Sequence, residues 1–482
     1  MVGWAGVWVG TVATAFLKGK VVMGFLGEAG LGWAGLWWGL GVVMVAAFGV
    51  GESWGQTYPL REAVECSPRA GLPNAMANMK AGEAVKVDYF GGSITAQPGY
   101  RVKSLAWLGE RYPEAKFSEV NAAIGGTGSN IGAFRMEQDV LEARPDLIFV
   151  EFAVNDSGAS TGQIRGAMEG IVRQAWAALP GADLCFVYTI KDADIAGLQA
   201  GTMKRSASVM EEVADYYGIP SIHLGVAVAE LVRQGKVVMK GEESAQPERV
   251  SGDELNESSG RDAAAGGPIA FSKDGVHPYL DTGHALYMDA IARSWPAIEA
   301  ASGPAGSHEL GEPLDPAHWQ AAQQRSIDAA MLTGPAEAVD LRGGEFRGFS
   351  QRLDSLWKLE PGATLSFAFR GSHAMIYDVI GPGTGQVQVE VDGRLTTQER
   401  FDKYCTYWRL SAIRIAEEAD PAAVHRVKLT VLDEPLDKAE ILRPNHPDAF
   451  AEDPEKFAGR AVYLGRVMLV GELVEDDEAT GD

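Results

Sequence analysis

Ser93 stands directly after two glycines in the stretch GGSITA, at the end of the apolar run VKVDYF. A serine hydroxyl acts as a nucleophile only when a base accepts its proton and hydrogen-bond donors stabilise the resulting oxyanion. Without such partners, Ser93 would be a turn residue or the cap of a helix that begins near Gly99. The base and the donors must therefore be sought elsewhere in the chain.

His277 is the candidate base among the eight histidines, because Asp274 precedes it by three residues in the stretch DGVHP. A turn through Gly275 would place the carboxylate against the imidazole Nδ1 and leave Nε2 facing a serine. Such a pair is ordinary turn chemistry when it occurs alone. Its meaning depends on whether the other parts of a hydrolytic site are present.

Two further stretches could supply donors to an oxyanion. The glycines of NAAIGGTGSN could present backbone N–H groups, and Asn155 in EFAVND could add a side-chain amide. An asparagine at the end of a strand is otherwise a common turn residue. The four parts occur in the order serine, glycine, asparagine and Asp-x-x-His.

The elements that must position these residues form a regular alternation between Lys86 and about Pro296. Five apolar runs are typical of buried strands: VKVDYF, KFSEVN, DLIFVEFAV, DLCFVYTI and PSIHL. Four stretches have helical spacing: YRVKSLAWLGERY, IGAFRMEQDVLEA, QIRGAMEGIVRQAWAAL and SASVMEEVADYYG. The alternation predicts a parallel sheet covered by helices on both faces, with catalytic residues at the carboxyl ends of its strands. Ser93 and Asn155 both follow such strands.

With these four parts in this order, residues 85–295 resemble the SGNH (GDSL-type) hydrolase family. The resemblance implies a flavodoxin-like three-layer α/β/α domain with a parallel sheet, which catalyses hydrolysis without a metal or organic cofactor. It also implies a role for each part: Ser93 as nucleophile, His277 as general base and then acid, Asp274 as its orienting carboxylate, and Gly126 and Asn155 as the oxyanion hole beside the Ser93 N–H. Gly125 takes the place of Gly126 if the alignment of the glycines shifts by one.

One position departs from the family pattern. The usual block reads Gly-Asp-Ser, whereas this chain has Gly91-Gly92-Ser93. The missing aspartate is not the triad carboxylate, so catalysis is expected to survive, although the support of the nucleophile turn must come from elsewhere. The stretches GGSITAQPGYR, NAAIGGTGSNIGAFR and FVEFAVND are similar to a branch of the family found among carbohydrate esterases.

Other side chains near the motifs have more ordinary interpretations. Arg135 and Glu137 follow the glycine block, and a solvated ion-pairing role competes there with contact to a substrate. His284 falls on the final helix of the domain and is expected to be a packed or surface residue. Trp107 and Trp176 lie at helical core spacing, which indicates packing.

Composition and hydrophobic pattern divide the chain into five segments. They are an N-terminal segment (1–55), the hydrolase domain (56–301), a linker (302–337), an all-β sandwich (338–475) and an acidic tail (476–482). The sandwich is predicted from runs that alternate with period two, such as QVQVEVDG and HRVKLTVL. Within the hydrolase domain, residues 236–270 are polar and rich in Gly and Ser, so we expect a long surface loop that is either a lid or a plain insertion.

Charge and cysteine content exclude several classes. The net charge of −23 argues against nucleic-acid binding and favours neutral substrates. The three cysteines show no CxxC or Cys/His spacing, so neither a zinc site nor a disulfide framework is indicated. Cys185 is expected to be buried, while pairing of Cys66 with Cys405 depends on whether the fold brings them together.

The N-terminal segment carries no charge from Ala29 to Gly51, and Lys18 and Lys20 precede that run. Its length could cross a bilayer, and the small residues near its end offer cleavage sites. We expect a signal peptide first and an uncleaved anchor second. Either predicts a secreted or periplasmic protein that meets the membrane only through this segment.

These observations together predict a serine esterase that removes O-acetyl groups from a polysaccharide. Trp408, in FDKYCTYWRL, would contribute an aromatic face for a sugar ring. In a strand, Tyr404 and Trp408 lie on one side and Tyr407 on the other, and one of these two sides must face the core. The alternatives are a lipid or aryl esterase or a thioesterase with the same machinery, and a non-catalytic glycan-binding protein. The intact serine, asparagine, aspartate and histidine argue against the last of these.

Overall fold

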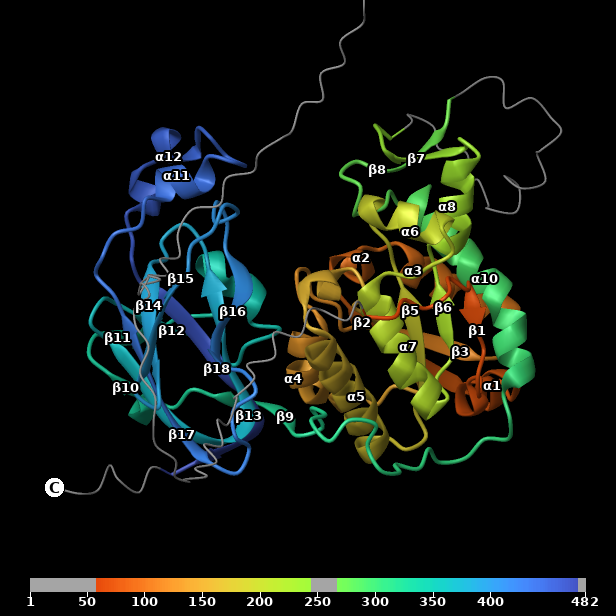
Figure 1. Cartoon of the computed structure of the whole chain (residues 1–482), viewed down its shortest axis with the longest axis horizontal. Coiled ribbons are helices and arrows are strands. Elements are labelled where there is room, and N and C mark those ends of the chain that lie inside the picture. The colour runs from red at the N-terminus through yellow and green to blue at the C-terminus, as the bar shows by residue number, and fades with distance from the viewer. Residues whose placement is uncertain (1–57, 244–266, 476–482) are drawn as a thin grey trace, which may run out of the picture. The chain divides into compact units, whose positions relative to one another are not determined.

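Two β-sheets organise the protein in the computed structural model, which describes residues 58–243 and 267–475 (Figure 1). All of these residues fall within one compact unit, Thr57–Asp482. The predicted N-terminal segment, most of the predicted 236–270 loop and the acidic tail lie outside the described residues. Within the described ranges no helix is long and apolar enough to span a membrane.

The first sheet has six strands in the order β1-β6-β5-β4-β2-β3. Its members are β1 (Cys66–Ser67), β2 (Ala84–Gly91), β3 (Lys116–Asn121), β4 (Leu147–Glu151), β5 (Asp183–Tyr188) and β6 (Ser221–His223). The five predicted strands pair in parallel, and β1 pairs with β6 in the antiparallel direction at one edge. The sequence does not predict β1 because this strand is only two residues long. The strand order reverses at β2, so the carboxyl end of β2 is where a ligand site is expected in such a sheet.

Helices connect these strands and cover the sheet. They are α1 (Pro73–Lys80), α2 (Ser93–Ala96), α3 (Tyr100–Arg111), α4 (Ser129–Asp139), α5 (Thr161–Ala178), α6 (Ile195–Gln199), α7 (Arg205–Tyr217), α8 (Val226–Arg233) and α10 (Gly283–Ala301). Short 3₁₀ segments follow α4, β4 and β5, at Leu141–Ala143, Asn155–Gly158 and Asp192–Asp194. The four helices predicted from apolar spacing are α3, α4, α5 and α7, within a few residues at each end.

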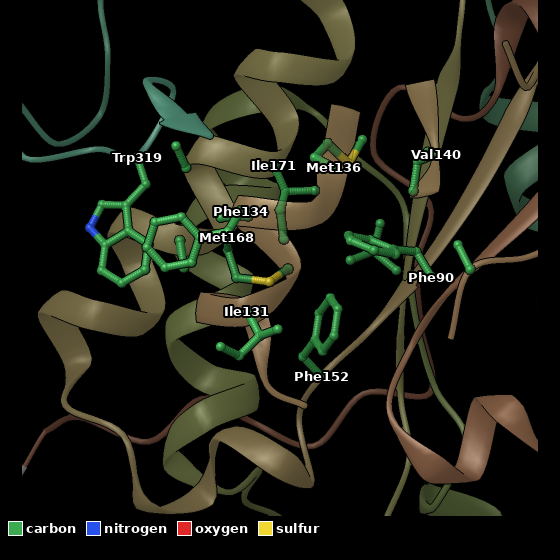
Figure 2. Packing of buried hydrophobic residues seen from close by; sticks show 14 of the residues in the cluster. Phe90, Ile131, Phe134, Met136, Val140, Phe152, Met168, Ile171 and Trp319 are labelled. Carbon is green, nitrogen blue, oxygen red and sulfur yellow. The ribbon is translucent and has the colours of Figure 1, made fainter. Parts of the chain in front are cut away.

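Two apolar clusters lie on opposite sides of the first sheet, as the alternation of strand side chains requires. One contains Val87, Tyr89 and Phe149 with apolar residues of α3 and α10. The other contains Phe90, Ile148 and Val150 with residues of α4, α5 and α7, and Figure 2 shows part of it. This is the three-layer α/β/α arrangement that the sequence predicts.

Residues 236–270 are less irregular than expected. Their two described ends form a small parallel sheet, in which β7 (Val237–Lys240) pairs with β8 (Ile269–Ser272). The short apolar stretch KVVMK accounts for β7, and β8 leads directly into the loop that carries Asp274 and His277. The prediction of a continuous loop was therefore wrong at both ends of the segment.

The second sheet is antiparallel and has ten strands. These are β9 (Ala322–Ser326), β10 (Leu332–Thr333), β11 (Ala336–Ala338), β12 (Trp357–Leu359), β13 (Thr364–Ile380), β14 (Gln386–Val391), β15 (Arg394–Glu399), β16 (Arg409–Ala416), β17 (Val424–Val431) and β18 (Val462–Val474). The long strand β13 pairs with β18 on one edge, and with β17 and then β16 on the other. Its inner face packs a separate apolar core that includes Phe369, Ile376 and Leu469.

Irregular and short helical segments complete this all-β region. Two 3₁₀ segments precede β13, at Ala329–Met331 and Gly344–Phe349, and another spans Glu455–Phe457. Helices α11 (Lys438–Leu442) and α12 (Ala449–Glu452) lie between β17 and β18, beside a small cluster around Phe401 and Phe457.

Trp319, just before β9, joins the all-β region to the α/β layer. Its ring lies 5.5 Å from that of Phe134 on α4, measured between centroids (Figure 2). The centroid of the His373 ring on β13 is 4.5 Å away. Its backbone and ring also cover Gly170 and Gly166 of α5, which have no side chain to keep it away. The apolar cluster on this side of the parallel sheet is therefore continuous with residues of β13 and β18.

Candidate functional site

Ser93 lies at the carboxyl end of β2 as the first residue of α2, where the sequence places a nucleophile. Its Oγ is 2.8 Å from Nε2 of His277, although 184 residues separate the two in the chain. On the other side of the same imidazole, Nδ1 is 2.7 Å from Oδ2 of Asp274. The structure thus brings together the predicted serine, histidine and aspartate.

Asp274 fixes the orientation of the imidazole. Its Oδ1 accepts hydrogen bonds from the backbone N–H groups of Val276 and His277, each at 2.8 Å, so Oδ2 remains aimed at Nδ1. Partial burial acts to raise the pKa of Asp274, but the bonds from His277 and from the two amides outweigh it, and the pKa lies below its usual value. A charged Asp274 holds the proton on Nδ1 and leaves Nε2 free to accept the serine proton.

The turn that carries Asp274 and His277 is anchored on both flanks. Gly275 has a φ of +83°, which a glycine adopts without strain. Its N–H donates to Oγ of Ser272 at 2.7 Å, and its carbonyl accepts from the backbone N–H of Asp192 at 2.7 Å. The expected contribution of Gly275 to this turn is therefore visible in the backbone.

Glycines of the loop after β3 lie beside the serine. A Cβ built on Gly125 would be 3.6 Å from Cβ of Ser93, whereas one built on Gly126 would meet nothing within 4 Å. Gly126 has a φ of +77°, which explains the need for glycine at this point. Both residues are exposed, and their amides donate to no other group of the described chain, so both could serve a developing oxyanion.

Asn155 begins the 3₁₀ segment after β4 and lies against the nucleophile turn. Its side chain approaches Gly92 so closely that a Cβ at residue 92 would be 2.2 Å from Oδ1. The three strand ends therefore bring together Ser93, the glycine loop and Asn155. Their roles as nucleophile and oxyanion donors remain predictions.

Glu151 supports the nucleophile turn from beneath, and the sequence analysis missed it. This fully buried residue accepts hydrogen bonds from Thr95 on α2 at 3.2 Å and from Thr189 after β5 at 2.7 Å. Burial raises the pKa of Glu151 above its usual value, and the threonine bonds oppose that effect. A glutamate inside the apolar run LIFVEF was the available signal, because such a residue needs polar partners.

Asp156 supports the other side of the site. Its Oδ1 accepts from the backbone N–H of Ser129 at 3.0 Å, which caps α4 where the glycine loop ends. Burial raises the pKa of Asp156 to about 6, and the bond from Ser129 partly opposes the rise. In the VND stretch, only the asparagine has a role predicted from the sequence.

His284 is buried, which excludes the surface alternative. Its Nδ1 accepts from the backbone N–H of Tyr100 at 3.1 Å, and its Nε2 is 3.2 Å from Oε1 of Gln97. Burial lowers the pKa of His284 to about 3, so the ring stays neutral. Trp176 is buried and Trp107 is half-buried against Trp295, as expected for packing residues.

Arg135 requires a correction, because it is neither solvated nor placed to contact a substrate. Only 1% of the residue is exposed, and its guanidinium lies 4.3 Å from the centroid of the Phe90 ring. It donates to the carbonyl of Gly91 and pairs with Asp139. The sequence predicts a surface charge at Arg135, because the carbonyls of Gly91 and Ala122 that bind it belong to other segments of the chain.

Trp408 also differs from expectation. Residues 401–408 form a loop before β16, so strand alternation does not apply to them. The Trp408 ring packs against Phe346 and Tyr463, with centroids 4.8 and 4.9 Å away, and its Nε1 donates to Glu345 at 2.5 Å. The exposed aromatic side chains of this loop are Tyr404 and Tyr407.

The cysteines and possible metal ligands need only brief mention. Cys66, Cys185 and Cys405 are all free thiols, so the possible pairing of Cys66 with Cys405 does not occur. Cys185 is buried as expected. Among residues 58–243 and 267–475, no three His, Cys, Asp or Glu side chains are grouped so that they could hold a metal ion.

A solved structure has an architecture similar to that of this chain. The chain is similar to a two-domain esterase, CEX, that is active on acetylated mannans, solved alone and with mannopentaose. The identity is 19% and the TM-score 0.61, over 85% of this chain and 98% of that one. A further match is Axe2, an acetylxylan esterase from Geobacillus stearothermophilus, with 18% identity and a TM-score of 0.33 over 45% of this chain and 96% of that one.

Part of the chain matches a family model. No curated protein matches the chain. Residues 89–254 match the GDSL-like Lipase/Acylhydrolase family, a stretch that includes Ser93, Gly126 and Asn155 and ends before Asp274 and His277. The family match therefore lies within the parallel-sheet part of the chain, which is followed by the antiparallel all-β region.

Proposed function

We propose that this protein is an exported serine esterase that removes O-acetyl groups from a polysaccharide. The observation that carries the proposal is the continuous arrangement of Ser93 Oγ, the His277 imidazole and the Asp274 carboxylate, joined at 2.8 and 2.7 Å. A hydroxyl, a base and an orienting carboxylate in this order are the parts that acyl transfer requires.

The reaction follows from the positions of these groups. Ser93 Oγ attacks the ester carbonyl carbon while His277 Nε2 accepts its proton, and the carbonyl oxygen becomes an oxyanion facing the glycine loop and Asn155. When the tetrahedral intermediate collapses, the C–O bond to the alcohol breaks and His277 returns the proton to the leaving oxygen. Water then attacks the acyl carbon while His277 Nε2 accepts its proton. The C–O bond to Ser93 breaks, His277 returns the proton to Ser93 Oγ, and acetic acid leaves and ionises to acetate.

The openness of the site supports a polymeric substrate. The side chains of His277 and Asp274 are 43% and 51% exposed, so the reacting hydroxyl lies near the surface instead of at the end of an apolar tunnel. An exposed triad can meet a short acyl group that projects from a chain too large to enter a pocket. The net charge of −23 further favours a neutral glycan over a polyanionic one.

The two-sheet architecture gives a second line of support, since CEX shares it and acts on acetylated mannans. Acetylated mannan is therefore the first substrate to test. Export rests on the uncharged run between Ala29 and Gly51, which suits a polysaccharide met outside the cytoplasm.

The test compares acyl chains and carriers on the full chain. We expect release of acetate from acetylated mannan and from p-nitrophenyl acetate, little hydrolysis of p-nitrophenyl palmitate, and loss of both acetate activities in Ser93→Ala. Preference for the palmitate ester would reject a carbohydrate acetylesterase in favour of a lipid esterase. Equal activity in Ser93→Ala would reject the serine mechanism itself.

A further inference from the structure

Arg135 lies where β2, the strand that ends just before Ser93, meets the glycine loop after β3 (residues 122–128, the oxyanion loop below). Its Nη2 donates to the carbonyl of Gly91 at 3.1 Å, and its Nη1 donates to the carbonyl of Ala122. Gly91 is the last residue of β2, two before Ser93, and Ala122 is the first residue after β3, on the way to Gly126. One buried guanidinium therefore holds two backbone segments that end at the reacting groups.

The start of the oxyanion loop is further tied to the same carbonyl. The backbone N–H of Ile124 donates to Gly91 at 3.0 Å, so Gly91 accepts from both the loop and Arg135. The loop ends where Asp156 accepts from Ser129. Between these attachments lie Gly125 and Gly126, and a Cβ built on Gly125 would be 3.6 Å from Cβ of Ser93.

The charge of Arg135 is balanced by Asp139, four residues further along α4, whose Oδ2 lies 2.9 Å from Nη1. The same Oδ2 lies 3.2 Å from Nη1 of Arg352. Arg352 belongs to the turn between the 3₁₀ segment Gly344–Phe349 and β12, in the all-β region. Its other nitrogen, Nη2, donates to the carbonyl of Asn121 at 3.3 Å.

Arg352 thus binds the same piece of backbone as Arg135. Asn121 ends β3 and Ala122 follows it, so two adjacent carbonyls are each fixed by a guanidinium, and both guanidiniums share Asp139. Arg135 is 1% exposed, and the side chains of Asp139 and Arg352 are 11% and 22% exposed, so water competes little for the shared carboxylate, whereas the bond from Arg352 to Asn121 lies at the surface. A hydrogen bond from a charged guanidinium is stronger than one between neutral groups, and burial away from water strengthens it further.

We propose that Arg352 of the all-β region is a positioning residue for the esterase, acting through Asn121 and Asp139 on the oxyanion loop. The all-β region would then complete the catalytic domain instead of serving only to bind glycan. The kinetic part of this inference rests on the proposed esterase function. Arg352 touches no reacting group, so its removal should loosen the loop and lower kcat without changing KM, since small displacements of oxyanion donors are costly.

The kinetic test uses the full chain and p-nitrophenyl acetate. We expect Arg352→Ala to lower kcat at least tenfold with KM within a factor of two, and Arg352→Lys to recover part of the loss. Arg347→Ala is the matched control, because Arg347 is exposed on the neighbouring 3₁₀ segment, and its kcat should equal that of the wild type. An unchanged kcat in Arg352→Ala, or an equal loss in Arg347→Ala, would overturn the proposal.

A second measurement separates this proposal from the proposed function. Amide hydrogen exchange of the same variants, read by mass spectrometry, requires no turnover. We expect Arg352→Ala to speed exchange at residues 121–128 about tenfold and to leave residues 272–277 unchanged. If Arg352→Ala does not fold, Arg352→Gln, which keeps a donor for Asn121 but no charge, takes its place with a smaller increase expected. Wild-type exchange at residues 121–128 in both variants would reject the positioning role, whereas an inactive wild type would reject only the esterase.

Discussion

The side chain of Asn155 occupies the space that any side chain at position 92 would need, since a Cβ there would lie 2.2 Å from Asn155 Oδ1. With Asn155 in this position, only glycine fits at residue 92. The Asn155 side chain is short and can rotate away, so a substitution at Gly92 should displace this proposed oxyanion donor and leave the fold intact.

The first prediction is that Gly92→Ala lowers kcat on p-nitrophenyl acetate by tenfold or more, with little change in melting temperature. Gly109→Ala on α3 is the control, because a Cβ there meets nothing within 4 Å. Gly109→Ala should leave kcat unchanged and stabilise the helix by up to about 1 kcal/mol. A Gly92→Ala enzyme with wild-type kcat would show that Asn155 keeps its place or has no role.

The second prediction concerns Asn155 itself. Removing one oxyanion donor costs about 10²- to 10³-fold in kcat, so Asn155→Ala should slow turnover by that factor. Because Gly92→Ala acts by displacing the same amide, the double variant should be no slower than Asn155→Ala alone. Multiplicative losses in this cycle would mean that the two positions affect catalysis independently.

The third prediction tests the orientation of the imidazole. Asp274→Asn can donate to Nδ1 of His277 and thereby move the ring proton to Nε2, where it blocks acceptance of the serine proton. We expect kcat to fall by about 10³- to 10⁴-fold, as for the corresponding change in serine proteases, with KM nearly unchanged. Asp281→Asn, a change at an exposed neighbour whose carboxylate pairs with Lys103, should retain full activity. A loss confined to KM would contradict the assigned role.

The fourth prediction follows from the buried carboxyl of Asp156, whose pKa burial raises from 3.8 to about 6. The folded state binds this proton more tightly than the unfolded chain, so the stabilisation is complete below pH 3.8 and is lost as pH rises through 6. The loss corresponds to about 3 kcal/mol. Asp156→Asn can still accept from Ser129 and cannot ionise.

Urea unfolding of Asp156→Asn and the wild type at pH 4 and pH 7 measures this effect. The free energy of unfolding of the variant should improve relative to the wild type between the two pH values, by up to about 3 kcal/mol. The comparison isolates Asp156 because the other buried carboxyls are common to both proteins. An identical difference at both pH values would mean that Asp156 does not titrate in this range.

Much of the hydrolase fold could be predicted because its strands are buried on both faces and its helices on one. Such strands appear as short apolar runs, and the position of a residue just after a run locates it at the carboxyl edge of the sheet. That reasoning placed Ser93, the glycine loop and Asn155 near one another. The Asp-x-x-His spacing supplied His277 from a distant part of the chain.

The residues that the sequence hid are those whose partners are backbone atoms far along the chain. Arg135 bonds to the carbonyls of Gly91 and Ala122, and Arg352 bonds to that of Asn121, none of which leaves a mark in composition or periodicity. Trp408 was misread for a different reason. The predicted strand begins too early, because it includes the aromatic-rich residues before Arg409. These residues form a loop, in which strand alternation does not decide which side chain is buried.

The last prediction separates packing from glycan contact in that loop. Trp408 packs against Phe346 and Tyr463, whereas Tyr407 is 56% exposed. Truncation of the half-buried ring should cost about 3 kcal/mol, so Trp408→Ala should lower the melting temperature, and Tyr407→Ala should not. A sugar ring needs an open aromatic face, so affinity for acetylated mannan, measured by affinity electrophoresis, should fall in Tyr407→Ala while activity on p-nitrophenyl acetate persists. Unaltered mannan affinity in Tyr407→Ala would exclude its ring as a glycan contact.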